Sequence, residues 1–235
     1  MLEVLRSKER GRTKIDWLDS YHSFSFGEYY DPKNMGFGPL RVINDDLIQA
    51  GAGFPTHPHR NMEIVTIVTQ GAVAHRDSSG GEGIIRVGEV QKMSAGKGIF
   101  HSEFNASDKE LLKLYQIWIM PNQNGLKPGY EDIRYDVAEK KNKLLLVASN
   151  NHGDGVIFLN QDAKIYLADL EAGTSLSYQT DKSRGVYLHV TEGSVEVEGV
   201  KLSSGDAIKL TEVESVEIKA SENSGILLFD VVMNF

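Results

Sequence analysis

The sequence contains no cysteine, and this absence excludes several kinds of chemistry at once. Without thiols the chain cannot form disulfides, hold a metal through thiolates or use a cysteine nucleophile. Because disulfides are typical of oxidising compartments, their absence favours a cytoplasmic protein. Residues 1–8 also lack the apolar core of a signal peptide, which agrees with that location.

Long apolar runs and an excess of positive charge are missing as well. No stretch approaches the ~20 consecutive apolar residues that a membrane-spanning helix needs, so we expect no membrane association. The formal net charge is −8 at pH 7 and the isoelectric point is about 5.4. Nucleic-acid affinity comes mainly from neutralising phosphates, so direct nucleic-acid binding is not expected. The negative net charge does not argue against binding to a protein partner.

What the sequence does contain is short β-type segments separated by glycine-rich turns. Residues 64–68 form a β-branched run before a Gln-Gly turn, and residues 111–120 alternate with apolar side chains on both faces, which is typical of an inner strand. No long helix is predicted, only a short one near residues 136–141. Residues 1–12 are charged and indicate an edge strand. These patterns predict an all-β protein.

An internal repeat divides the chain into two halves. Residues 187–197 repeat the apolar and glycine rhythm of residues 65–75. Between the halves, residues 121–135 are rich in proline, glycine and asparagine, which predicts a linker. We therefore expect an N-terminal domain at 1–138 that carries a metal site and a C-terminal domain at 139–235 that has no metal ligands.

Three of the seven histidines lie in one glycine-punctuated window with a carboxylate beside the last. His57 and His59 are two residues apart, and Glu103 follows His101 at the same spacing. Side chains two apart on a strand share a face, so each pair needs only an extended backbone. If the two strands are neighbours, the four side chains can bind one divalent metal ion. Pro58 cannot donate to a ladder and places the first pair at a sheet edge or barrel rim.

Other side chains compete for a place at this site. Glu63 lies four residues past His59 and reaches the metal only through a turn, so we prefer Glu103 as ligand and keep Glu63 for the surrounding layer. For His22, a buried histidine with satisfied hydrogen bonds is favoured over a substrate contact. His75 is expected to face solvent or the core, away from the metal.

Aromatic side chains are concentrated just upstream of the window. Phe24, Phe26, Tyr29 and Tyr30 are expected to form the core of the first barrel and the wall of its cavity. Gln116 is expected to add a polar group near that cavity. In the repeat, residues 179 and 181 stand where the first histidine pair stands, and neither is a histidine.

The spacing of the window resembles the two cupin motifs. Gly51-x5-His57-x-His59-x3-Glu63 is similar to the first motif, and Gly98-x2-His101-x3-Asn105 to the end of the second. Gly71 comes one residue later than the usual spacing, and Gly96 replaces the usual proline. Both departures fit the pirin family, which residues 17–26, 53–63, 93–103 and 115–121 resemble closely. In the first half of the chain the resemblance extends to individual residues, whereas in the second half it extends only to the order of strands and turns.

This resemblance implies a fold and a cofactor. The fold is a bicupin, two jelly-roll β-barrels in tandem with few short helices. The metal ligands are His57, His59, His101 and Glu103, and the family's usual ion is Fe(II). The same donors also suit Zn, Mn, Co, Ni or Cu, because ligand type alone does not select among these ions. No other cofactor is implied.

The resemblance also implies two alternative functions. Bacterial pirins suggest a quercetin 2,3-dioxygenase-like oxidoreductase that opens a flavonol with O2, with Glu103 as ligand and proton acceptor. Eukaryotic pirins suggest a non-enzymatic, iron-dependent redox sensor that binds a protein partner. The enzyme is the preferred interpretation, and a monomer is expected.

Overall fold

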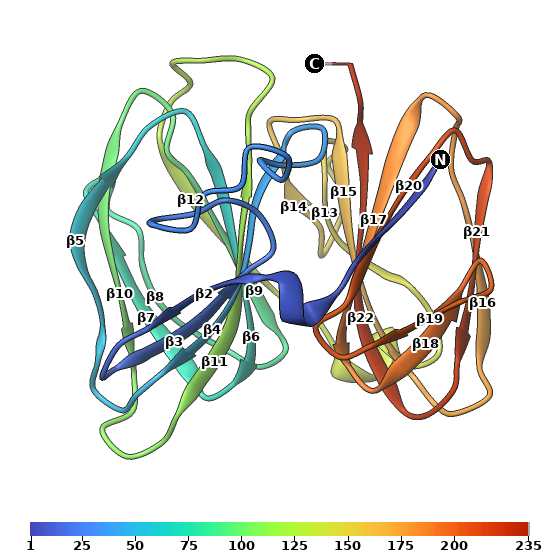
Figure 1. The fold of residues 1–235 in the computed structure, drawn as a ribbon. Helices are drawn as coiled ribbons and strands as arrows, with labels where there is room; N and C mark the ends of the chain where they lie inside the picture. Colours follow the sequence, from blue (N-terminus) through green and yellow to red (C-terminus); the bar gives the residue numbers. More distant parts are fainter. Residues whose placement is uncertain (235) are drawn as a thin grey trace.

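The computed structural model describes residues 1–234 and consists of two β-barrels that lie side by side (Figure 1). Each barrel pairs a seven-stranded sheet with a four-stranded sheet. Helical structure in the described residues is limited to two short 3₁₀ turns, η1 (Ser7–Glu9) and η2 (Val137–Lys140). No helix among them has the length and apolar character needed to cross a membrane. The predicted all-β bicupin is confirmed, and η2 lies where a short helix was predicted.

The first barrel contains the histidine window. Its large sheet consists, in spatial order, of β12 (Gly129–Arg134), β9 (Glu89–Ser94), β6 (Glu63–Gln70), β11 (Leu112–Ile119), β4 (Leu40–Ile48), β3 (Leu18–His22) and β2 (Gly11–Lys14). Its small sheet consists of β5 (Gly53–His59), β10 (Ile99–Asn105), β7 (Ala72–Asp77) and β8 (Glu82–Arg86). The β-branched β6 and the apolar β11 lie at the centre of the large sheet, as strands buried on both faces should.

The second barrel repeats this arrangement. Its large sheet consists of β1 (Leu2–Leu5), β20 (Ala207–Thr211), β17 (Arg184–Glu192), β22 (Ser224–Val232), β15 (Ala163–Leu170), β13 (Leu145–Ser149) and β14 (Ile157–Phe158). Its small sheet consists of β16 (Ser175–Gln179), β21 (Ser215–Ala220), β18 (Ser194–Val197) and β19 (Val200–Ser203). The order β20-β17-β22-β15-β13 matches β9-β6-β11-β4-β3 of the first barrel, so the internal repeat is present in the fold.

Two edge strands depart from the expected layout. The predicted N-terminal edge strand exists as β1, but it pairs with β20 of the second barrel (Figure 1). Part of the predicted linker is also a strand, because β12 pairs with β9 and extends the large sheet of the first barrel. Reading 121–135 as linker throughout was therefore wrong. The domain boundary at residue 138 stays a prediction.

A continuous apolar core joins the two barrels. It combines side chains from both large sheets, among them Phe24 and Ile43 of the first half with Tyr187 and Phe229 of the second. The Phe24 and Tyr187 ring centroids are 5.5 Å apart. Burying such a side chain contributes roughly 1.5–3 kcal/mol, so this shared core holds the barrels as one unit. Phe24 is therefore core between the barrels and not wall of the metal cavity.

The interior of the second barrel is filled by apolar side chains. Tyr178 of β16 and Val216 and Ile218 of β21 belong to a buried cluster on the strands that correspond to β5 and β10. Among residues 1–234, both groups of side chains with metal-ligand geometry lie in the first barrel.

Candidate metal centre

Three histidines converge between neighbouring strands of the first barrel. β5 and β10 pair antiparallel, with His57 directly opposite His101. One ring nitrogen from each of His57, His59 and His101 lies within 4.8 Å of the others. Of these, His57 Nε2 and His101 Nε2 are 3.0 Å apart. The two dipeptide-spaced pairs thus lie on adjacent strands, and Glu103 lies outside this group of three histidines.

Local backbone features place the first pair. β5 is the edge strand of its sheet, which is where a proline such as Pro58 is tolerated. The carbonyl of Pro55 accepts a hydrogen bond from His57 Nδ1 at 2.8 Å, which leaves His57 Nε2 with its lone pair free toward the cluster. Gly53 lies so close to β10 that a Cβ there would be 2.3 Å from the Glu103 carbonyl oxygen. The glycine therefore allows the two strands to meet.

Glu103 is buried and surrounded by hydrogen-bond donors. Its Oε1 accepts from Gln91 Nε2 at 2.8 Å and from Thr66 Oγ1 at 3.2 Å, and its Oε2 accepts from Gln116 Nε2 at 2.6 Å. Gln116 thus lies at the cavity, as expected. Glu103 forms a second group with His101 and His75, and His101 joins this group to the histidine cluster.

His75 is a site residue that the sequence reasoning missed. It is 2% exposed, its Nε2 is 3.0 Å from Asp77 Oδ2, and its Nδ1 is 3.8 Å from Glu103 Oε1. Of the two expected alternatives, solvent or core, His75 takes the core, but its place opposite Glu103 was not predicted and arises because β7 is the other neighbour of β10. The alternation of side chains along a strand could have predicted this position, because Val73, His75 and Asp77 share the buried face of β7.

The electrostatics give these side chains the protonation states that a metal needs. Burial lowers the pKa of His59 to about 4, and the neighbouring His57 adds to this effect. Burial also lowers the pKa of His101 to about 4, against the opposing charge of Glu103. For Glu103, burial raises the pKa, but the facing His75 and His101 and the Gln116 amide outweigh it and lower the pKa to about 2. At neutral pH, His59 and His101 are therefore neutral imidazoles and Glu103 is a carboxylate, as metal ligands must be.

The donor geometry fits a divalent transition metal. Two nitrogens bound at right angles to one ion, each about 2.1 Å from it, lie about 3 Å apart, which is the separation of the His57 and His101 nitrogens. The buried His59 Nε2 has no hydrogen-bond partner among residues 1–234, so it is free to bind an ion. Imidazole and carboxylate donors together suit Fe, Mn, Co, Ni, Cu or Zn.

Glu63, the competing carboxylate, is engaged elsewhere. It is fully buried at the start of β6, and its Oε2 accepts hydrogen bonds from Ser94 Oγ and Asn160 Nδ2, each at 3.1 Å. Asn160 belongs to the second half of the chain, so Glu63 links the barrels. It lies in neither metal-ligand group among the described residues.

Aromatic residues surround the histidine cluster. The Trp118 ring packs edge-on against His59 with centroids 4.8 Å apart, and Phe26 packs against Trp118 at 5.4 Å. His22 is buried behind Phe26, and its Nδ1 is 2.9 Å from Asn44 Oδ1, which agrees with the expected satisfied histidine. Tyr30 is 72% exposed, so its predicted place in the barrel interior was wrong.

Comparisons with known proteins cover almost the whole chain. A family model described as Pirin matches residues 4–119, and one described as Quercetinase C-terminal cupin domain matches residues 146–231. The chain is 46% identical over 231 residues to a quercetin 2,3-dioxygenase of Escherichia coli strain K12, covering 98% of this chain and 99% of that protein. It is 40% identical over 215 residues to a pirin-like protein of Caulobacter vibrioides, covering 91% of this chain and 92% of that protein. The crystal structure of the bacterial pirin YhhW from Escherichia coli in complex with nickel(II) superposes with a TM-score of 0.93, 45% identity and 99% coverage of both chains.

Proposed function

Because this chain belongs to the pirin family, we propose that it is a metal-dependent dioxygenase that opens flavonols such as quercetin with O2. The observation that carries this proposal is the convergence of the His57, His59 and His101 nitrogens within 4.8 Å, next to an ionised Glu103. The similarity to a protein named quercetin 2,3-dioxygenase over 98% of the chain supports the reaction class. An enzyme of this kind is an oxidoreductase.

We assign His57, His59, His101 and Glu103 as the residues that would hold the ion. Fe(II) is the preferred metal, and the nickel(II) complex of the related YhhW shows that a similar protein accepts another divalent ion. When bound, the ion supplies a Lewis acid that lowers the pKa of a coordinated hydroxyl and the redox chemistry that O2 requires. These four side chains would hold the ion without using all of the positions that such an ion can offer, so a substrate oxygen could also reach it.

The protein side chains orient the substrate and take up its proton. Glu103 is ionised at neutral pH, so its carboxylate can accept the proton of a flavonol hydroxyl without first losing one. Gln116, Gln91 and Thr66 hold both carboxylate oxygens, which limits the rotation of Glu103 during the transfer. Trp118 beside His59 offers an aromatic face against which a flat phenolic ring can pack.

Oxygen uptake with quercetin tests the proposal. The Fe(II)-loaded protein should consume O2 and release carbon monoxide, while a His57→Ala/His101→Ala variant should lose at least about 100-fold of the rate because ligand loss removes the ion. A His152→Ala variant, which changes an exposed turn histidine, is the matched control and should keep full activity. Equal rates of oxygen uptake by the wild type and the double variant would contradict the dioxygenase function. The alternative function, a redox sensor that binds a protein partner, would then be favoured.

A further inference from the structure

A buried histidine–aspartate pair on β7 lies beside the proposed metal ligands. The side chains of His75 and Asp77 have no exposed surface, and His75 Nε2 is 3.0 Å from Asp77 Oδ2. β7 pairs with β10 so that Asp77 is opposite His101 and His75 is opposite Glu103. The pair is therefore next to both of the ligands that β10 provides, although neither side chain is itself a proposed ligand.

Asp77 is fixed by the turn that joins β7 to β8. Its Oδ1 accepts hydrogen bonds from the backbone N–H of Ser79 at 2.7 Å, from Ser79 Oγ at 2.7 Å and from the backbone N–H of Gly81 at 3.1 Å. These three donors occupy Oδ1 and leave Oδ2 for His75. An ionised carboxylate accepts hydrogen bonds and donates none, so His75 Nε2 donates to Asp77 and the orientation of the ring is fixed.

Two other rings pack against His75. Tyr130 of β12 stacks on it with centroids 5.0 Å apart and 27° between the ring planes, and the His101 centroid is 5.4 Å from that of His75. A Cβ at Gly81 would lie 2.7 Å from Tyr130 Cβ and 2.2 Å from Asp77 Oδ2. The glycine therefore allows the turn to close over both side chains, and the space around His75 is tightly filled.

The second ring nitrogen of His75 faces a metal ligand. His75 Nδ1 is 3.8 Å from Glu103 Oε1, the oxygen that also accepts hydrogen bonds from Gln91 and Thr66. Because Nε2 is bound to Asp77, the ring cannot turn away from Glu103 without losing that hydrogen bond. The turn after β7 is thus connected to Glu103 through Asp77 and His75.

We propose that His75 is a positioning residue of the metal centre, which holds Glu103 and the His101 ring in place for the ion while Asp77 holds His75. Side chains behind the ligands commonly orient metal-binding groups in this way. This inference rests on the metal ligands assigned under the proposed function, but it does not require turnover of a flavonol.

Nickel titration of the intact protein, in competition with a chelator, tests this role. His75→Phe keeps a ring that can pack against Tyr130 but removes both nitrogens, so the nickel dissociation constant should rise about 10- to 100-fold. His75→Asn keeps an amide nitrogen near the position of Nδ1 and should recover part of that loss. Asp77→Asn should also weaken nickel binding, because the amide NH2 that replaces Oδ2 accepts no hydrogen bond from His75.

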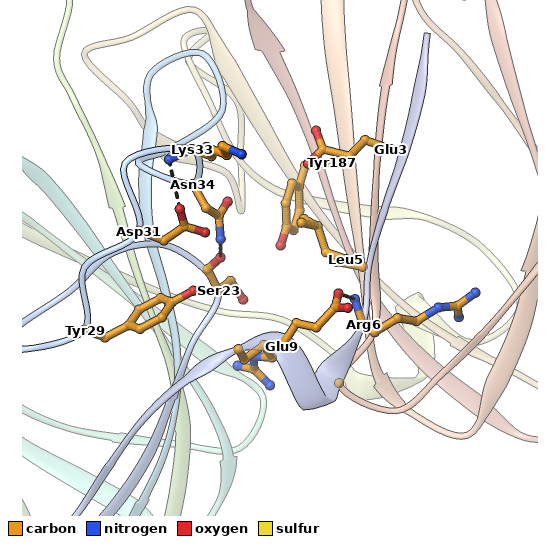
Figure 2. A pocket seen from close by; sticks show the side chains of 13 residues that line it. Glu3, Leu5, Arg6, Glu9, Ser23, Tyr29, Asp31, Lys33, Asn34 and Tyr187 are labelled. Carbon is orange, nitrogen blue, oxygen red and sulfur yellow. Dashed lines mark hydrogen bonds between the residues drawn. The ribbon is translucent and has the colours of Figure 1, made fainter.

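Asp31→Asn is the matched control for Asp77→Asn. Asp31 Oδ1 also accepts a hydrogen bond from the backbone N–H two residues ahead, that of Lys33 at 3.0 Å, but Asp31 lines a polar cavity between the two barrels (Figure 2). None of the proposed metal ligands lines this cavity. Asp31→Asn should therefore bind nickel as tightly as the wild type.

Two further measurements separate positioning from a general loss of stability. Thermal unfolding identifies a variant that fails to fold, and if His75→Phe does so, Asp77→Asn provides the result. The visible absorption spectrum of bound nickel depends on the arrangement of its ligands. It should shift in folded His75→Phe and Asp77→Asn but not in Asp31→Asn.

The His57→Ala/His101→Ala protein distinguishes failure of this inference from failure of the ligand assignment. Nickel binding at wild-type affinity in the double variant would overturn the ligand assignment and, with it, this inference. If the double variant loses nickel while folded His75→Phe and Asp77→Asn keep wild-type affinity and spectrum, only the positioning role of His75 is overturned.

Discussion

At the scale of single residues, the metal centre depends on side chains that do not bind the metal themselves. Thr66, Gln91 and Gln116 come from three strands of the large sheet and all donate to Glu103, while His57 Nδ1 donates to the Pro55 carbonyl. Such outer hydrogen bonds fix the orientation of ligands before an ion arrives. Two predictions concern individual buried side chains.

The first prediction concerns Gln116. In Gln116→Leu, Glu103 Oε2 loses its 2.6 Å hydrogen bond and the carboxylate is no longer held toward the histidines. We expect nickel affinity, measured by competition with a chelator, to fall about 10- to 100-fold. Gln179→Leu, on the exposed surface of the second barrel, is the control and should bind nickel as the wild type does. An unchanged affinity in Gln116→Leu would show that Glu103 needs no such support.

The second prediction concerns Asp46, a buried carboxyl on β4. Burial raises its pKa to about 7, and the charges of Asp45 and Glu103 add to this, although Ser20 donates a hydrogen bond to it. Its folded pKa lies above the unfolded value of about 3.9, so the stability it contributes is present below pH 4 and lost as pH rises through 7. Asp46→Asn should therefore gain stability relative to the wild type between pH 5 and pH 8.

Urea unfolding at the two pH values measures this difference. The free energy of unfolding of Asp46→Asn minus that of the wild type should increase by on the order of 1–3 kcal/mol between pH 5 and pH 8. A difference that is the same at both pH values would mean that Asp46 does not titrate in this range.

At the scale of elements, the site is made by the pairing of β5 with β10. The two dipeptide spacings predicted that the members of each pair share one face of a strand, because alternation on a strand is a local property, whereas the pairing of the two strands was only a condition of the prediction. The role of His75 was not predicted, because it depends on which strand lies on the other side of β10. Similarly, β1 and β12 join sheets far from their sequence neighbours, and long-range strand pairing has no local signal.

Gly53 provides a test of the strand pairing. A Cβ there would lie 2.3 Å from the Glu103 carbonyl oxygen and 2.4 Å from the Phe104 Cα, both backbone atoms that cannot move alone. Gly53→Ala should lower the free energy of unfolding by about 1–3 kcal/mol and weaken nickel binding, because β5 is pushed away from β10. In Gly129→Ala on β12, the added Cβ meets no atom within 4 Å, and both properties should stay at wild-type values. Wild-type nickel affinity in Gly53→Ala would contradict this role of the close approach.

At the scale of the whole molecule, the two barrels differ in the side chains that fill them but share one apolar core. The second barrel has apolar side chains on the strands that correspond to the histidine strands, and the apolar cluster between the barrels draws on both halves. The N-terminal strand β1 adds a backbone connection, because it pairs in the second barrel before the chain enters the first (Figure 1). Unfolding of one barrel should therefore expose the core of the other.

Phe229→Ala tests this coupling. The side chain is fully buried in the shared core, so its loss should cost about 3–5 kcal/mol. Both tryptophans, Trp17 and Trp118, lie in the first barrel, so their fluorescence reports a mutation made in the second. We expect fluorescence and circular dichroism to report the same unfolding midpoint, and this midpoint should fall equally by both methods in Phe229→Ala. Phe100 is 56% exposed, so Phe100→Ala should leave both midpoints unchanged. A fluorescence midpoint that stays at the wild-type value in Phe229→Ala would show that the barrels unfold separately.

The most direct test of the central claim is the anomalous scattering of nickel in crystals of the intact, nickel-loaded protein. The account predicts one strong peak in the first barrel, about 2.0–2.2 Å from a ring nitrogen of each of His57, His59 and His101 and from a carboxylate oxygen of Glu103. A peak at another position, or no peak between these side chains in fully loaded protein, would contradict it.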